Sequence, residues 1–434
     1  ANTAVGGYAL YVNTAANNTA VGYQTLYSNT SGASNVAMGR EALSQNTTAS
    51  NNTGLGYRAL YLNTTGASNV ALGAYALDAN TTAAGNVAVG PSALGANTTG
   101  ATNTAIGNEA LDANTTASNN VAVGHASLSA NTTGANNVAV GVIALDANTT
   151  AANNTAVGYG SLSANTTAAN NTAVGFFSLY ANTTGTGNTA LGKSALAANT
   201  TASYNTGLGE NALISNTTGY SNTAVGNTSL YANTTADHNT AIGSSSMAQN
   251  TTGSYNTAVG SGVLPSNTEG QRNTAVGYAA LNTNTTASYN VAFGMYTLLS
   301  NTTGSSNSAI GYNSLYANTT GYYNIGVGGA TLQANTTGVQ NTALGYGVLA
   351  ANTTADNNTA VGHYALSANT TGTENVAMGA NALDANTEGN YNVALGNYAL
   401  TTDTKGGRNV AIGRSALTAQ NFASATDSYN TAVG

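Results

Sequence analysis

The chain repeats a unit of 17 residues from Asn18 to Asn409 without a slip, over 23 consecutive steps. Each unit starts with Asn, then Thr or Val, Ala, an aliphatic residue and Gly, and we number its positions 1 to 17 from that Asn. An irregular first coil spans residues 2–17, and a four-residue insertion lies within residues 418–429. Such a repeat is typical of a solenoid, in which each unit is one coil that needs its neighbours to form a core.

The repeats continue along the whole chain. No linker, charge run or shift in composition interrupts residues 1–434, so we expect a single repeat array without a second domain. Ala1 and Gly434 both fall inside a repeat, and we therefore expect a fragment or a processed chain.

The pattern inside one unit predicts strands rather than helices. Position 5 is Gly in all 26 copies and several positions are Asn, both poor residues for a helix interior. Positions 1 to 5 alternate, with an aliphatic or Phe at position 4, and such alternation between Gly and Asn indicates a short strand and a turn. A second short strand is expected around position 9, which is Leu in all but one coil. The predicted fold class is all-β: a parallel β-solenoid, or β-roll, of about 25 coils.

The same pattern predicts which side chains form the core. We expect position 4 (Val21, Phe293) and Leu at position 9 to point into the coil. Position 3 is always Ala or Gly, and we expect this opposite strand face, together with small residues at position 8 such as Ala42, Ser127 and Thr297, to pack closely between chains. The prediction is therefore self-association into an oligomer or a filament.

The repeated Gly and Asn residues are interpreted as structural. Gly at position 5 suggests a positive φ or a close approach that a Cβ would block. Asn at positions 1 and 12 can satisfy backbone groups at the corners of its own and adjacent coils. The residues assigned to turns and ladders in this way include Asn18, Gly22, Asn35, Gly39, Asn46 and Asn52.

Glycosylation is the alternative explanation for position 12. Most copies read Asn-Thr-Thr, an acceptor pattern present at Asn46, Asn63 and Asn318, and Asn17 and Asn51 supply further acceptors. A glycan on every coil would crowd its neighbours, because coils repeat at only ~4.8 Å.

The charged residues predict neither catalysis nor nucleic-acid binding. Only 5% of residues are charged, the net charge is −7, and Lys and Arg are not clustered, so no nucleic-acid surface is expected. His125, His238 and His363 lie in distant repeats, which leaves metal and acid–base sites without their parts. We therefore predict no enzyme activity, no catalytic, cofactor or metal site, and no cofactor.

Aspartate recurs at position 10 of alternate coils, at Asp78, Asp112 and Asp146. We interpret these residues as a solvated stripe that is too widely spaced for a carboxylate dyad. No apolar run approaches the ~18–20 residues of a membrane span.

Tyrosine is the residue type that most suggests an interaction surface. All 25 Tyr fall outside the predicted core positions. They could cover apolar surface or pack against another chain, or they could form an adhesive surface for glycans, matrix proteins, other cells or neighbouring fibres. The candidates pair positions 6 and 10 of one coil: Tyr23 with Tyr27, Tyr57 with Tyr61, and Tyr312 with Tyr316.

The blocks Asn-Thr-Ala-Val-Gly, small-Leu and Asn-Thr-Thr-Gly resemble head repeats of YadA-like trimeric autotransporter adhesins and repeats of bacterial and phage fibre proteins. The Ala-aliphatic-Gly step matches along the whole chain, as at Ala20-Val21-Gly22. The period of 17 departs from the shorter unit of those adhesins, and no neck, stalk, anchor or chaperone segment is recognisable in the sequence. The resemblance implies a homotrimeric β-roll on the cell surface that binds host matrix or other cells.

The expected function is a non-catalytic structural or adhesive fibre or filament protein, extracellular or on the cell surface. The alternative is the shaft of a phage tail fibre. Ice binding is a weaker alternative, based on ladders of Thr pairs such as Thr47 and Thr48.

Overall fold

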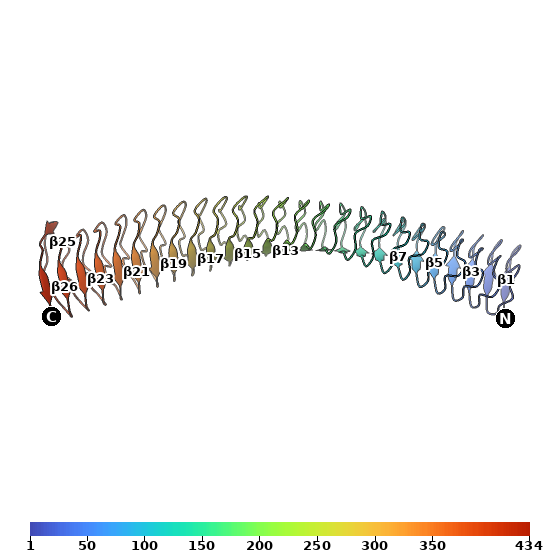
Figure 1. Ribbon diagram of the computed structural model, residues 1–434, viewed down its shortest axis with the longest axis horizontal. Coiled ribbons are helices and arrows are strands. Elements are labelled where there is room, and N and C mark those ends of the chain that lie inside the picture. Colours follow the sequence, from blue (N-terminus) through green and yellow to red (C-terminus); the bar gives the residue numbers. More distant parts are fainter. The chain divides into compact units, whose positions relative to one another are not determined.

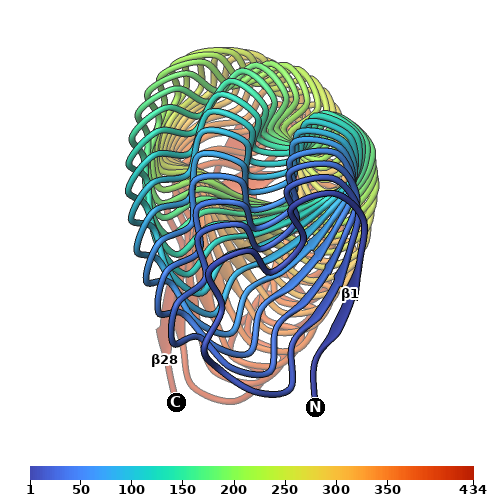
Figure 2. The same ribbon diagram turned by 90° about the vertical axis from the view of Figure 1, so that its right-hand side faces the viewer.

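The computed structural model describes residues 1–434 and confirms an all-β parallel β-solenoid of about 25 turns with a 17-residue repeat and no helix. The chain divides into two compact units, Ala1–Tyr220 and Ser221–Gly434. Within each unit the strands lie along the same side of successive coils (Figure 1). Seen from the N-terminal end, a coil is an elongated loop with its strand on one side and turns on the other (Figure 2).

Nearly every coil contributes one strand of three residues, at positions 2 to 4. In the first unit these are β1 (Thr3–Val5), β2 (Thr19–Val21), β3 (Val36–Met38), β4 (Thr53–Leu55), β5 (Val70–Leu72), β6 (Val87–Val89), β7 (Thr104–Ile106), β8 (Val121–Val123), β9 (Val138–Val140), β10 (Thr155–Val157), β11 (Thr172–Val174), β12 (Thr189–Leu191) and β13 (Thr206–Leu208). In the second unit they are β14 (Thr223–Val225), β15 (Thr240–Ile242), β16 (Thr257–Val259), β17 (Thr274–Val276), β18 (Val291–Phe293), β19 (Ser308–Ile310), β20 (Ile325–Val327), β21 (Thr342–Leu344), β22 (Thr359–Val361), β23 (Val376–Met378), β24 (Val393–Leu395), β26 (Val410–Ile412) and β28 (Thr431–Val433).

Successive strands of a unit pair in parallel and in register. Between β10 and β11, for example, Thr155 lies opposite Thr172 and Ala156 opposite Ala173. Because paired strands are offset by one 17-residue repeat, the residues at a given position of successive repeats form a column of equivalent side chains. One departure occurs in the second unit, where β25 (Gly406–Gly407) and β27 (Thr426–Asp427) form a separate two-stranded sheet.

The predicted second strand around position 9 is wrong. Positions 6 to 11 form a turn in which the residues at positions 7 and 9 of the repeat have positive φ, as at Gln24 (φ 53°) and Leu26 (φ 50°). The turn still bonds to the neighbouring coil, because Leu26 N donates to Ala42 O at 3.1 Å. The apolar residue at position 9 reflects burial in the coil rather than the alternation of an extended strand.

The two faces of the strand are the reverse of those predicted. Ala20 at position 3 is 0% exposed, whereas Met38 and Phe293 at position 4 are 47% and 55% exposed. The interior has room only for a small residue here, because a Cβ on Gly54 would lie 3.4 Å from Leu43 Cδ1. The core therefore consists of Ala at position 3, Leu at position 9 and the small residue at position 8.

This reversal also corrects the predicted contact between chains. Ala42, Ser127 and Thr297 at position 8 are 0% exposed inside their own coils and cannot meet another chain. The strand face that points outward carries positions 2 and 4 instead.

Gly at position 5 meets both of the conditions expected for it. Gly22 has φ +140°, and a Cβ there would lie 2.7 Å from the carbonyl oxygen of Gly39 in the next coil. Any other residue would be strained and would push neighbouring coils apart.

Candidate interaction surfaces

The asparagines at positions 1 and 12 lie inside the coils and bond from coil to coil. At position 12, Asn63 Nδ2 donates to Asn46 Oδ1 at 2.9 Å and to the carbonyl oxygen of Gly66 at 3.0 Å. At position 1, Asn52 N donates to Asn35 Oδ1 at 2.9 Å, and its Nδ2 donates to the same Gly66 oxygen. Asn18 is placed in the same way, with 1% of its surface exposed. These residues satisfy the polar groups of the turns.

Burial of this ladder argues against glycosylation at position 12. Asn46, Asn63 and Asn318 are 0% exposed, and Nδ2, the atom that a glycan would modify, is in each case a hydrogen-bond donor within the ladder. The folded coil leaves no room for a sugar there. Asn17 and Asn51 at position 17 are exposed.

The tyrosines lie on the outside of the coils, and many of their rings contact a ring of the neighbouring coil. Tyr11 stacks on Tyr27 with centroids 5.2 Å apart, and Tyr8 meets Tyr23 edge to face at 6.0 Å. The predicted pair Tyr23 and Tyr27 is not in ring contact. Each ring therefore belongs to a column that runs across coils, and the exposed columns combine aromatic faces with hydroxyl groups.

The same arrangement holds at the other predicted pairs. Tyr57 meets Tyr75 of the next coil at 5.2 Å, and Tyr312 meets Tyr296 at 6.4 Å. Tyr312 is 54% exposed, whereas Tyr316 in the same coil is half-buried.

Arg58 lies against both rings of the predicted pair Tyr57 and Tyr61. The Arg58 guanidinium lies 4.7 Å from the Tyr61 ring centroid and 5.5 Å from that of Tyr57. Arg58 Nε also donates to Glu41 Oε2 at 2.7 Å, and Arg40 Nε donates to Oε1 of the same carboxylate at 3.1 Å. The hydrogen bond from Arg58 lowers the pKa of Glu41, and the same bond raises the pKa of Arg58.

The aspartates at position 10 are less solvated than the sequence suggests. A Cβ on Gly95 would lie 2.8 Å from Asp112 Oδ1 and 3.8 Å from Asp78 Oδ1, so both carboxylates lean into the space above this glycine. Burial raises the pKa of Asp112, and burial with a smaller effect of the Asp112 charge raises that of Asp78. The structure contains no group of three or more His, Cys, Asp or Glu residues that could hold a metal ion.

The outward strand face carries a continuous column of apolar residues. Position 4 is Val, Ile, Leu, Met or Phe in every copy, yet Val5, Leu191 and Leu344 are 58%, 44% and 46% exposed. Position 2, on the same face, is Thr, Val, Ser or Ile, so no charged residue interrupts either column.

The threonine doublets divide between two environments. Thr47 is half-buried, and its Oγ1 donates to the Thr64 carbonyl oxygen at 3.0 Å, whereas Thr48 is exposed. Only one column of each doublet therefore faces solvent.

No helix of the chain has the length and apolar character needed to cross a membrane. No known family pattern matches the chain, and no curated protein matches it in sequence.

Proposed function

We propose that this chain is a non-catalytic structural or adhesive fibre protein, extracellular or on the cell surface, whose outward strand face packs against further copies of the same chain. The observation that carries this proposal is the invariably apolar position 4 on the outside of the coil. Contiguous apolar surface of more than a few hundred Å² marks an interaction site in a soluble protein.

The outward face leaves apolar area available for an interface. Full burial of a Val or Leu side chain is worth about 1.5–3 kcal/mol at about 25 cal/mol per Å², which corresponds to about 60–120 Å². In β1–β13, the position 4 residues of β1, β3, β5, β7, β12 and β13 are 37–58% exposed, and the other position 4 residues are partly buried. The exposed ones alone leave about 150–350 Å² in water. A standard interface buries about 800 Å² per partner, and position 2 on the same face adds to this area.

A second copy is the occupant that best matches this face. The partner must present apolar groups at the spacing of the coils, about 4.7–4.9 Å, along many repeats. Another array has the same spacing, and the absence of charge at positions 2 and 4 removes like-charge repulsion between copies. The resemblance to adhesin head repeats favours a homotrimer, and a filament is the other form of such packing.

The test compares matched lysine substitutions on two columns. In one variant Val123, Val140 and Val157 at position 4 become Lys; in the control Thr133, Thr150 and Thr167 at position 14 become Lys, as Lys405 already is at this position. With folding verified by circular dichroism, sedimentation equilibrium should show a monomer for the position 4 variant and wild-type assembly for the control. A monomeric wild-type chain at tens of micromolar, or an unchanged position 4 variant, would refute self-association.

The adhesive part of the proposal depends on the exposed tyrosines. Tyr23→Ala and Tyr312→Ala remove rings that are 46% and 54% exposed without touching the core. Adhesion of the protein to cells or matrix should weaken while its sedimentation stays unchanged. Unchanged adhesion would leave a purely structural fibre.

A further inference from the structure

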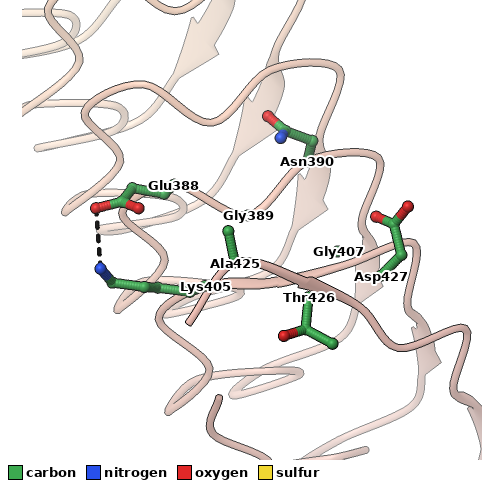
Figure 3. A pocket seen from close by; sticks show the side chains of 8 residues that line it. All are labelled: Glu388, Gly389, Asn390, Lys405, Gly407, Ala425, Thr426 and Asp427. Atoms are coloured by element: carbon green, nitrogen blue, oxygen red, sulfur yellow. Dashed lines mark ion pairs between the residues drawn. The ribbon is translucent and has the colours of Figure 1, made fainter. Parts of the chain in front are cut away.

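The second unit contains a pocket where the repeat departs from its pattern. The pocket has a volume of about 290 Å³, near the lower end of the range of about 300–1,000 Å³ for small-molecule sites. Figure 3 shows Glu388 and Lys405 at one side and Asn390 and Asp427 at the other, with small residues between them.

The local sequence explains why the pocket forms here. The insertion allows β27 to pair with β25, which brings Asp427 beside Gly407. A Cβ on Gly407 would lie 2.9 Å from Asp427 Oδ1 and 3.1 Å from the carbonyl oxygen of Asn390. A larger residue at position 407 would crowd both atoms, so the Gly406–Gly407 doublet and the insertion build the site together.

Apart from Thr426, each polar side chain of the pocket is held by one neighbouring residue. Lys405 Nζ pairs with Glu388 Oε1 at 3.1 Å, and Asp427 Oδ2 accepts from Arg408 Nε at 2.9 Å. Asn390 Oδ1 accepts from the backbone N of Thr373 at 2.7 Å. Two acceptors, Glu388 Oε2 and Asp427 Oδ1, and two donors, Lys405 Nζ and Asn390 Nδ2, remain for a ligand.

Charge and hydrogen-bonding groups define the class of ligand. The two carboxylates are offset by Lys405 and Arg408, so the site favours neither an anion nor a cation. The pocket presents both donors and acceptors, and vicinal hydroxyl groups, which both donate and accept, suit such a lining.

We propose that this pocket binds one neutral hexopyranose unit of a glycan. This inference rests on the adhesive part of the proposed function and is independent of self-association.

The experiment is saturation-transfer NMR on the full chain with glucose, galactose, mannose and N-acetylglucosamine, alongside glucuronate and glycine. Glu388→Thr and Lys405→Thr test the site, because both restore the residue found at position 14 of most coils and should fold. Glu269→Thr makes the same change at position 14 of another coil, outside the pocket, and is the matched control.

At least one neutral sugar should bind, and each pocket variant should weaken its Kd about tenfold or more while Glu269→Thr leaves it unchanged. The proposal is overturned if no neutral sugar binds at 10 mM (roughly −3 kcal/mol), if glucuronate or glycine binds better, or if the pocket variants bind like wild type. Sugar binding without cell adhesion would refute the adhesive function and keep the site. Adhesion that persists in pocket variants that bind sugar like wild type would keep the adhesive function and overturn the site.

Discussion

Replacing Asn165 with Asp should break the position 12 ladder in the middle of the first unit. Asn165 Nδ2 donates to Asn148 Oδ1 and to the Ala168 carbonyl oxygen, both at 3.0 Å, and the residue is 0% exposed. The substitution replaces this donor group with an oxygen that faces two other oxygens. Asn148 Oδ1 then lies buried without a donor, whereas the Ala168 oxygen keeps its hydrogen bond from Asn154 Nδ2 at 3.0 Å.

The size of the effect follows from these contacts. Each unsatisfied buried acceptor costs about 1–3 kcal/mol, and an uncompensated buried charge costs about 3–5 kcal/mol. We expect Asn165→Asp to lower the free energy of opening of its coil by about 3–5 kcal/mol at pH 7. Burial and the facing oxygens raise the folded-state pKa of the introduced carboxyl above its unfolded value of about 3.9. The penalty is therefore absent below that value and grows as the pH rises toward the folded-state pKa.

The chain contains its own control at Asp403, where the same position is naturally a carboxylate. There Gly406 N donates to Oδ1 at 2.9 Å and Gln420 Nε2 donates to Oδ2 at 2.6 Å. In other coils the Asn Oδ1 at position 12 accepts a hydrogen bond from the position 12 residue of the next coil. Asn386 Oδ1 accepts from Gly389 N at 3.1 Å instead. Because donors surround this carboxylate, Asp403→Asn should change stability by only about 1 kcal/mol.

Amide hydrogen exchange is the suitable assay, because long repeat arrays open locally rather than in one step. Amides near residue 165 should exchange faster in Asn165→Asp, and amides many coils away should not. Thermal unfolding at pH 3 should bring the variant closer to wild type than at pH 7. Equal exchange in Asn165→Asp and Asp403→Asn, or a larger loss at pH 3, would refute this account of the ladder.

Two other substitutions test the remaining features of the coil. Gly124→Ala places a Cβ 2.4 Å from the Gly141 carbonyl oxygen at φ +135°, so amides of nearby coils should exchange faster. The control is Gly85→Ser, at φ +71° with its nearest contact at 3.5 Å, which should leave hydrogen exchange unchanged. Equal effects of the two substitutions would contradict the close approach at Gly124. Because burial raises the pKa of Asp112, the stability associated with its protonated form is present below the usual value and is lost as the pH rises. Asp112→Asn should thus raise the melting temperature at pH 7 but not at pH 3, whereas the exposed control Glu374→Gln should not; a lower melting temperature at pH 7 would contradict this.

Much of the fold could be predicted from the sequence, because the period and the invariant Gly and Asn positions admit few alternatives. The orientation of the strand could not be predicted. Alternation separates Ala20 from Val21 but does not say which is inside, and hydrophobicity favoured Val21. Leu at position 9 leaves space inside the coil for only a small side chain, so Ala20 points inward. That space exists only once the coil has closed.

The candidate sites were harder to predict than the fold. The columns of Tyr were visible in the sequence, but contact between Tyr11 and Tyr27 depends on the spacing of the coils. Nothing in Asn-Thr-Thr distinguishes the buried Asn46 from an accessible acceptor. The signal for the pocket was present as the Gly406–Gly407 doublet and the insertion, yet a departure from a repeat does not show what it encloses.

The coil-to-coil hydrogen bonds make the repeats interchangeable parts. Asn63 donates to the coil before it and accepts from the coil after it, as Asn80 does one repeat later. Removing or duplicating a whole 17-residue repeat therefore joins matching surfaces, and the ladder of hydrogen bonds stays continuous. An array of this kind can lengthen or shorten in evolution by entire coils, at little cost to the stability of those that remain.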